Sequence, residues 1–387
     1  MKTSILTTLR TTALRSVSAL VVLASSTLAL AQDPVGAMYQ KFATVPTEVA
    51  GISTFIEPPA SFNALEASDQ ELALYGFPPR PDKTANAQRY ESWAKMMIAP
   101  KARWKGPLKL SPHKMEAPPT AKASQTAQVN YQIQYENPFW SGFGNYKPIS
   151  TYNTSRTSQA SFSVAEAVFN VPIVEDPYGV SGCQNNANGI VNLMVGIDAP
   201  TLEAGVLADN PGWLYFSGCF VYTPIYYAQI GAGTSTSILQ EFTVNPGDTI
   251  FVEVWDTSST TGYAFIYDET TFTYATYAIT LTPIVGNSAQ FIMGRVYSNG
   301  STTLTPLPNY TNDFWSDVWA MDFGGRMFGP GTNTTTSTTV WYQMSDDAGD
   351  QETSYPTSYT QTFHTYGATY SIYWEAIGCA RYYGCTP

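Results

Sequence analysis

The sequence predicts an all-β protein, a large antiparallel β-sandwich of two packed sheets that follows a mostly helical or irregular N-terminal segment. Three observations lead to this prediction. Short alternating runs rich in β-branched and aromatic residues fill residues 131–387. Turn-forming Gly, Asn, Asp and Pro separate the runs, as at residues 245–248. Helix-capping and helix-stopping residues occur instead in the region before them, so the chain divides near residue 130.

Residues 1–31 have the pattern of a secretory signal peptide. Basic residues precede a short apolar run at 17–30, and the small residues at 29–31 fit a cleavage site. The run is too short to span a membrane, and no later stretch is apolar for about 18 residues. We expect a mature chain that begins near Gln32 and is secreted, or exported to the periplasm in a Gram-negative host. A frayed N-terminal helix is the alternative.

Residues 32–128 are predicted to form an N-terminal segment with two helices. Residues 68–71, Ser-Asp-Gln-Glu, cap a short helix that ends at Tyr75, with Gly76 as its stop. A second helix is expected over residues 83–97. It places four large side chains on one face: Tyr90, Trp93, Met96 and Met97.

Charge divides the chain at the same place. Residues 32–130 hold 11 Lys and Arg and 9 Asp and Glu, whereas residues 131–387 hold 5 and 21. The basic side chains concentrate at 92–115, before a linker-like stretch at 117–128 that is rich in Pro, Ala, Thr, Ser and Gln. The overall net charge of −11 argues against a nucleic-acid partner, whose phosphates need Lys and Arg.

Residues 129–387 are predicted to form the sandwich because short strands follow one another with almost no helix. The clearest strands are residues 190–197, 249–255, 263–267, 272–281, 290–297, 340–344 and 370–374. Whether residues 330–387 belong to the same sandwich is left open by the pattern.

The cysteines and histidines limit the chemistry. Four cysteines, Cys183, Cys219, Cys379 and Cys385, fit an oxidising compartment. Three pairings are possible, and the local pairs Cys183–Cys219 and Cys379–Cys385 are favoured. With only 2 histidines and no CxxC motif, the sequence predicts no metal site and no cofactor, and it disfavours Ser-His and Cys-His catalysis.

Carboxylates, amides and hydroxyls are therefore the expected chemical groups. A Glu with its usual pKa of about 4.3 can act as a base near pH 3–5, where His is protonated. A domain with few cations also avoids repulsion between positive charges in acid. The composition thus fits an acid-active protein, and a secreted protein that is merely acidic is the alternative.

Five short segments are distinctive. They are NPFWSG at 137–142, VFNVP at 168–172, VGIDAPTLEAG at 195–205, FTVNPGD at 242–248 and SAQFI at 288–292. In this order, over residues 135–325, they resemble segments of the eqolisins, the glutamic peptidases. The resemblance implies a concanavalin-like sandwich of two antiparallel sheets, and a Gln/Glu dyad on neighbouring strands of one concave sheet. It implies that the Glu activates water and that the Gln amide donates to the oxyanion.

The resemblance places a Glu where the family has Gln, and a Gln where the family has Glu. These residues are Glu203 and Gln290. Because water attack needs one base and one donor in reach, Glu203 is the expected base and Gln290 the expected oxyanion donor. Lost activity or a one-residue misalignment is the alternative.

Three further residues are expected in the substrate cleft: Trp140, Asp198 and Tyr226. The resemblance places Trp140 and Asp198 near the dyad, and Tyr226 belongs to an aromatic segment close to it. Each has a simpler alternative, which is packing for the aromatic residues and a turn for Asp198. The family's Trp before VGID is Met194 here.

The resemblance also implies a secreted precursor. Residues 32 to about 125 are then an inhibitory pro-segment, held to the acidic domain by residues 92–115 and removed at acid pH. An accessory domain that stays attached is the alternative. The expected partners are a protein or peptide substrate and the chain's own pro-segment, on a monomer that binds no membrane.

Three functions follow. The first is an acid endopeptidase that uses Glu203 and Gln290. The second is a glycoside hydrolase that uses Glu253 with Asp256, or Glu375. The third is a non-catalytic sandwich that binds carbohydrate or cell wall. Facing Glu203 and Gln290 side chains favour the first, whereas two carboxyl groups about 5–9 Å apart in a groove favour the second.

Overall fold

The computed structural model describes the part of the chain on which the fold is built. The described residues are 38–39, 42–98, 102–111, 114–115, 133–137, 139–147, 161–175, 190–209, 214–216, 219–221, 225–232, 238–297, 304–305, 309–311, 313–329, 337–345, 352–356 and 368–376.

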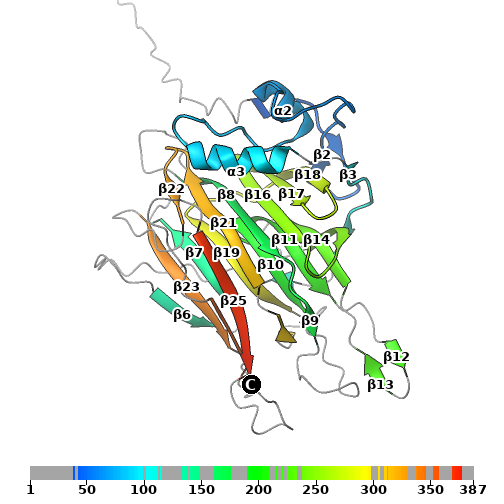
Figure 1. The fold of residues 1–387 in the computed structure, drawn as a ribbon, viewed down its shortest axis with the longest axis vertical. Helices are drawn as coiled ribbons and strands as arrows, with labels where there is room; N and C mark the ends of the chain where they lie inside the picture. Colours follow the sequence, from blue (N-terminus) through cyan, green and yellow to red (C-terminus); the bar gives the residue numbers. More distant parts are fainter. Residues whose placement is uncertain are drawn as a thin grey trace, which may run out of the picture. The chain divides into compact units, whose positions relative to one another are not determined.

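Two antiparallel sheets form the body of the protein (Figure 1). The strands of the first sheet, in spatial order, are β6 (Ile133–Asn137), β23 (Thr338–Ser345), β7 (Trp140–Tyr146), β19 (Ser288–Tyr297), β10 (Val191–Ile197), β11 (Leu202–Asp209), β14 (Ile225–Ala232), β15 (Ile238–Val244) and β4 (Lys109–Leu110). A short strand, β5 (Lys114–Met115), pairs with the end of β19.

The second sheet packs against the first. Its strands, in spatial order, are β25 (Ala368–Ala376), β21 (Asp313–Asp322), β8 (Phe162–Asn170), β16 (Thr249–Ser258), β17 (Thr261–Asp268), β18 (Thr273–Thr280), β2 (Ile52–Thr54) and β1 (Val45–Pro46). Strand β24 (Glu352–Pro356) pairs with both β23 and β25 and joins the two sheets. The strands near the C-terminus therefore belong to the sandwich.

Short pairings complete the described strands. They are β3 (Ala102–Arg103) along β18, β22 (Met327–Phe328) along β21, β12 (Leu214–Phe216) with β13 (Cys219–Val221), and β9 (Val174–Glu175) with β20 (Asn309–Tyr310). Among the described pairings, β6–β23 and β18–β3 run parallel and the others run antiparallel.

Alternation along the strands builds the core between the sheets. In β10, Leu193, Val195 and Ile197 point into the core, and the residues between them point to the outer face. Inner residues of β11, β16, β19 and β8 join the same cluster, and each large apolar side chain buried there contributes about 1.5–3 kcal/mol. The predicted all-β sandwich is confirmed.

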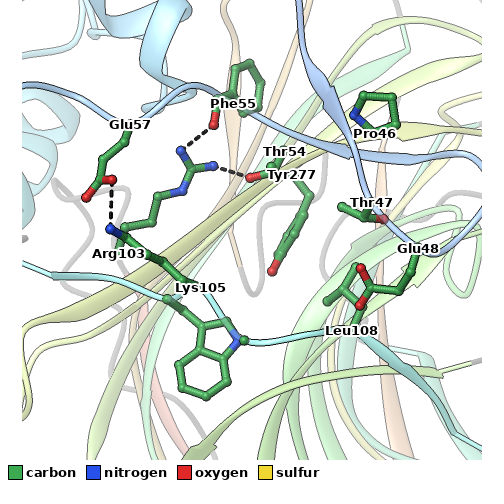
Figure 2. Close-up of a pocket in the computed structure, with 12 residues that line it drawn as sticks. Pro46, Thr47, Glu48, Thr54, Phe55, Glu57, Arg103, Lys105, Leu108 and Tyr277 are labelled. Atoms are coloured by element: carbon green, nitrogen blue, oxygen red, sulfur yellow. Dashed lines mark hydrogen bonds and ion pairs between the residues drawn. The ribbon is translucent and has the colours of Figure 1, made fainter.

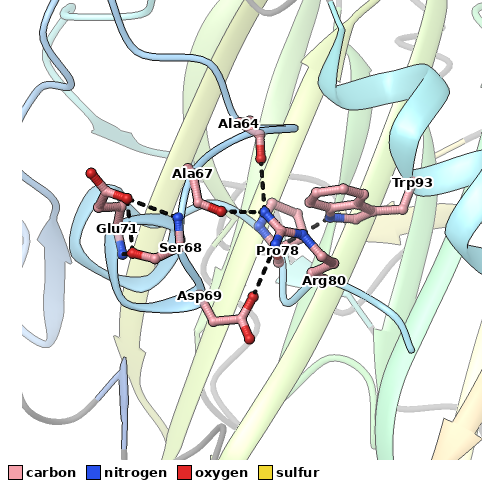
Figure 3. Close-up of polar contacts among 8 residues, drawn as sticks. All are labelled: Ala64, Ala67, Ser68, Asp69, Glu71, Pro78, Arg80 and Trp93. Atoms are coloured by element: carbon pink, nitrogen blue, oxygen red, sulfur yellow. Dashed lines mark hydrogen bonds and ion pairs between the residues drawn. The ribbon is translucent and has the colours of Figure 1, made fainter. Parts of the chain in front are cut away.

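The two predicted helices are present in the N-terminal segment. Helix α2 (Asp69–Tyr75) has Ser68 as its N-cap in a capping box with Glu71, and Gly76 closes it in a left-handed conformation (Figure 3). Helix α3 (Ala87–Met97) begins four residues later than predicted. The reason is a turn, in which the Asp82 carboxylate accepts hydrogen bonds from the backbone N–H groups of residues 84 and 85.

The N-terminal segment covers the outer face of the second sheet. Its apolar side chains, including Phe77 and Trp93, form one buried cluster with Trp255 and Tyr274 of that sheet. Arg80 fastens the segment internally by donating to the carbonyls of residues 64 and 67 (Figure 3). Further along, Arg103 donates to Phe55 O at 2.6 Å beside a cavity of about 320 Å³ (Figure 2).

One buried charge cluster joins helix α3 to this sheet. Arg89 lies 3.2 Å from the Glu253 carboxylate, and its guanidinium stacks over the Trp319 ring at 4.5 Å. Glu253 pairs directly across the sheet with Glu166, and both carboxyl groups are fully buried. Burial raises the pKa of Glu166 well above its usual value, and the charge of Glu253 raises it further.

Within the described part of the chain, no helix has the length and apolar character that a membrane crossing requires.

Candidate active site

Strand β10 brings the two predicted dyad residues together. Gly196 pairs with Glu203 on one side and with Gln290 on the other. Directly opposed residues of antiparallel strands project to the same face, so both side chains lie on the outer face of the first sheet. Their Cα atoms are two strand spacings apart, about 10 Å. Gly196, between them, has no side chain, and a Cβ added there would lie 3.0 Å from the Ala199 Cβ.

Local alternation explains this placement. Ala204 and Leu202 enter the core on either side of Glu203, and Ala289 and Phe291 do the same on either side of Gln290. The outer face is itself largely covered. Its apolar residues form a separate cluster: Trp140, Tyr146, Ile190, Met194, Ala199, Leu207, Ile292, Val296, Val340 and Tyr342. We call this surface, with Glu203 and Gln290, the site face.

Glu203 is almost completely buried, with 1% of its surface exposed. It leans toward β14, because a Cβ added at Gly231 would lie 2.3 Å from the Glu203 Cγ. The Oε2 atom has no hydrogen-bond partner in the structure described. Burial raises the pKa of Glu203 to about 8, because water no longer stabilises the charged form. This pKa is well above the ordinary Glu value on which the sequence prediction of acid activity depends.

Gln290 is held in a fixed orientation. Its Oε1 atom accepts a hydrogen bond from the Ala199 N–H at 3.2 Å, and its amide donates to the hydroxyl of Tyr146. The Tyr146 hydroxyl is also hydrogen-bonded to that of Tyr342. An amide carries two N–H donors, so one of them is left for a ligand. This second N–H is the group that can stabilise an oxyanion.

Asp198 has the turn role rather than a direct place beside the dyad. Its carboxylate accepts hydrogen bonds from the backbone N–H groups of residues 285–288 and from the Ser288 hydroxyl. The residue itself has a positive φ of 47°, which Asp tolerates better than most side chains. Asp198 therefore fixes the entrance to β19 two residues before Gln290.

The two predicted aromatic cleft residues lie on different faces. Trp140 is fully buried in the apolar cluster of the site face. Tyr226 is not on that face. It belongs to the core cluster between the sheets, and its hydroxyl accepts a hydrogen bond from Val174 N at 2.7 Å. The prediction of Tyr226 as a cleft residue is wrong, because the register of β14 turns Tyr226 inward.

None of the remaining predicted residues is placed beside the dyad in the described structure. Glu253 is fully buried beneath helix α3 in an ion pair with Arg89, next to a cavity of about 290 Å³ that Arg89 and Asp256 help to line. Asp256 is also buried, with 2% of its surface exposed. The side chains of Glu375 and Cys219 lie outside the description. Cys183, Cys379 and Cys385 lie outside the described residues, so the disulfides stay predictions.

No group of three or more His, Cys, Asp or Glu side chains in the described residues could hold a metal ion. The candidate reactive pair on the site face consists of the Glu203 carboxyl group and the oriented Gln290 amide. Two residues of the site face were not predicted from the sequence. Tyr146 and Gly231 have no motif of their own, and only the strand register places them beside Gln290 and Glu203.

The protein resembles several solved structures. Scytalido-glutamic peptidase with a transition-state analogue inhibitor is 16% identical, with a TM-score of 0.42, and the match covers 62% of this chain and 99% of that one. SCP-B, a member of the eqolisin family in complex with the tripeptide Ala-Ile-His, is 16% identical, with a TM-score of 0.40, and the match covers 61% and 100%. Aspergilloglutamic peptidase from Aspergillus niger is 20% identical, with a TM-score of 0.34, and the match covers 48% and 99%.

No curated protein matches the sequence. A family model does. The model of the Peptidase A4 family matches residues 151–362, a span that contains both Glu203 and Gln290. This span is more than half of the 387 residues, and the chain therefore belongs to the Peptidase A4 family.

Proposed function

We propose that this peptidase is an endopeptidase that hydrolyses peptide bonds with Glu203 as the general base and Gln290 as the oxyanion donor. The observation that carries the proposal is the position of both residues on one face, on either side of Gly196. Their Cα atoms lie two strand spacings apart, about 10 Å, and the scissile peptide bond would bind over the strand between them. The exchanged order of the two residues leaves one base and one donor in place.

The reaction follows from these groups. The ionised Glu203 carboxylate takes a proton from water, and the water oxygen bonds to the carbonyl carbon. The carbonyl oxygen gains negative charge and accepts the free N–H of Gln290. When the C–N bond breaks, Glu203 returns the proton to the leaving amine. The products are a carboxylic acid and an amine, and the base is regenerated.

Exchange of the dyad residues tests the assignment. We expect Glu203→Gln to lower kcat/KM on a protein substrate by about 10²–10⁴-fold. Gln290→Glu should lower it by about 10²–10³-fold. The double variant restores one carboxyl group and one amide and should recover part of the loss. Glu269→Gln, in the turn between β17 and β18, is the matched control and should leave kcat/KM unchanged. Full activity in Glu203→Gln would end the assignment.

The pH dependence provides a second test. A base must be ionised, and the pKa of Glu203 in the free enzyme is raised to about 8. We therefore expect kcat/KM to rise with pH and to level off above about 8. The sequence predicts activity in acid, which requires that the bound substrate lower the pKa of Glu203 by donating N–H groups to its carboxylate. In that case the apparent pKa in the pH profile of kcat is lower than the one in the profile of kcat/KM. A kcat/KM that falls steadily from pH 4 to 8 would contradict the base role.

Export from the cell is part of the proposal. The signal-like pattern of residues 1–31 and the four cysteines support a secreted or periplasmic monomer with two disulfides. N-terminal sequencing of the exported protein should give a start near Gln32. Mapping of the disulfides should give Cys183–Cys219 and Cys379–Cys385.

The role of the N-terminal segment is also a proposal. An inhibitory pro-segment is expected to lie over the active site. The described residues of 42–98 cover the outer face of the second sheet instead. These contacts support the alternative that we adopt, in which the segment stays attached to the active enzyme.

A further inference from the structure

Next to Glu203, the site face has a second amide that the proposed dyad does not use. Gln229 lies on β14, directly opposite Gly205 of β11, and the next pair on this face is Gly231 with Glu203. The four residues form a block in which the polar residues occupy one diagonal and the glycines the other. No side chain therefore stands between Glu203 and Gln229.

Gln229 is buried, although its amide atoms form no hydrogen bonds in the structure described. Its exposed fraction is 0%, and neither its Nε2 nor its Oε1 has a hydrogen-bond partner in the structure described. A buried donor and a buried acceptor left unpaired are both unfavourable, and native proteins rarely keep them. Such a pair of atoms is explained when a ligand supplies the missing partners.

The strand pairing next to Gln229 is irregular. The register of β14 with β15 shifts between Tyr227 and Gln229, so β15 contains an additional residue there. Bulges of this kind redirect side chains and occur preferentially beside active sites. The glycines are also required locally, because a Cβ at Gly205 would lie 1.8 Å from Leu193 O.

The unpaired atoms specify the chemistry of the ligand. The Gln229 Nε2 needs an acceptor and its Oε1 needs a donor. A peptide group offers both, because it has a C=O and an N–H. Diagonal neighbours on adjacent strands are roughly 7–8 Å apart. An extended peptide advances about 3.3 Å per residue, so this span corresponds to about two residues.

We infer that Gln229 is a substrate-positioning residue that binds the backbone peptide group about two residues from the scissile bond. The inference rests on the proposed function, because it assigns the bond cleavage to the neighbouring Glu203. Glu203 and Gln229 are diagonal neighbours on the same face. A peptide bound over Glu203 would therefore lie beside Gln229.

The test uses Gln229→Met, which keeps the side-chain length and removes both polar atoms. We expect KM for an octapeptide substrate to rise by at least about tenfold with little change in kcat, and KM for a dipeptide amide to stay unchanged. The melting temperature should rise, because an unsatisfied buried amide is replaced by an apolar group. Asn170→Met, which removes an amide on the second sheet, is the control and should leave KM unchanged.

A binding measurement separates this inference from the proposed function. In the Glu203→Gln background, calorimetry with the intact octapeptide should show weaker binding when Gln229→Met is added. Unchanged affinity and KM in a stable Gln229→Met variant would overturn the inference. A shift in the pH profile of kcat/KM would also overturn it, because Gln229 would then act through Glu203. If Glu203→Gln is fully active while Gln229→Met raises KM, the dyad assignment fails and the peptide subsite stands.

Discussion

Asp198 shows how one side chain outside the reactive pair sets the geometry of the site. Its carboxylate accepts hydrogen bonds from the backbone N–H groups of residues 285–288, which lead directly into the strand that carries Gln290. The next residue, Ala199, donates to the Gln290 amide oxygen at 3.2 Å. One turn therefore fixes both the entrance to this strand and the orientation of the Gln290 side chain, the proposed oxyanion donor.

Replacement of Asp198 should affect stability and catalysis together. Asp198→Ala leaves several N–H groups without their charged acceptor, and we expect the free energy of unfolding to fall by about 2–4 kcal/mol. We expect kcat/KM of the folded variant to fall by about tenfold or more, since the Gln290 amide is displaced. Urea unfolding and kinetics at 10 °C, where the variant remains folded, provide the measurements.

Asp248 is the matched control for Asp198. Its carboxylate accepts a hydrogen bond from Asn245 N at 2.6 Å in the turn that joins β15 to β16, two strands that carry neither dyad residue. Asp248→Ala should lose stability for the same reason and keep the kcat/KM of the wild type. Equal kinetic losses in the two variants would mean that the effect comes from stability alone.

Glycine has a comparable role at single positions on the site face. Gly196 separates Glu203 from Gln290, and Gly231 leaves the space that the Glu203 side chain occupies. A larger residue at Gly231 would push the carboxyl group aside, because the added Cβ falls within 2.6 Å of the Glu203 Oε1. The position of the Glu203 carboxyl group, the proposed base, therefore depends on a glycine of the neighbouring strand.

At the scale of elements, helix α3 is tied to the second sheet by charge as well as by apolar packing. Arg89 is the counter-charge of the buried Glu253, and Glu166 lies beside that carboxylate. Burial raises the pKa of Glu253, whereas the charge of Arg89 opposes that shift. Arg89 therefore favours the ionised form of Glu253, whereas burial favours the protonated form of both carboxyl groups.

Removal of the cation should give a pH-dependent loss of stability. In Arg89→Met, Glu253 must stay protonated when buried, so its pKa in the folded protein rises further above the unfolded value. A raised carboxyl pKa leaves stability intact in acid and reduces it as pH rises. We expect a loss of about 3–5 kcal/mol at pH 7 and a much smaller loss at pH 4, measured by urea unfolding.

Lys105→Met is the control for the buried pair. Lys105 pairs with Glu57 at 2.8 Å in the same N-terminal segment, with both side chains more than half exposed. Exposed ion pairs contribute between zero and about 1 kcal/mol, so this variant should change little at either pH. A loss in Arg89→Met that is equal at pH 4 and pH 7 would contradict the charge argument and point to packing alone.

At the scale of the whole molecule, the N-terminal segment and the sandwich share one buried interface. Segment residues such as Phe77, Trp93 and Met96 lie against the outer face of the second sheet, and β2 and β3 add to the edge of that sheet. Exposure of this aromatic surface to water would be unfavourable at about 25 cal/mol per Å² of apolar area. The segment therefore behaves as a layer of the fold.

Cleavage of the connection tests whether the segment is a layer or a removable pro-segment. We expect a cut engineered between residues 116 and 132 to leave the two pieces associated on size-exclusion chromatography at pH 7, with activity unchanged. Mass spectrometry after a shift to pH 3–4 should find the segment still present. Spontaneous cleavage within residues 100–130, followed by release of the segment and a rise in activity, would contradict this expectation and support an inhibitory pro-segment instead.

The sequence by itself determined the sandwich, and it led to the proposal that Glu203 and Gln290 are the reactive pair. Alternation along residues 190–197 and 290–297 depends only on neighbouring residues, and it was enough to place strands there. The cap at Ser68 and the stop at Gly76 are equally local. The resemblance to the eqolisins is confirmed by the family match, and the two motifs that carry Glu203 and Gln290 fall on strands that share β10.

Only the tertiary structure decided which groups meet across the sheets. Tyr226 and Tyr227 are adjacent aromatic residues, and the register of β14 alone turns Tyr226 into the core. Register also places Gln229 diagonal to Glu203, and folding brings Arg89 to a carboxylate 164 residues away in sequence. The raised pKa of Glu203 has the same origin, because burial depends on the surrounding layers rather than on neighbours in the chain.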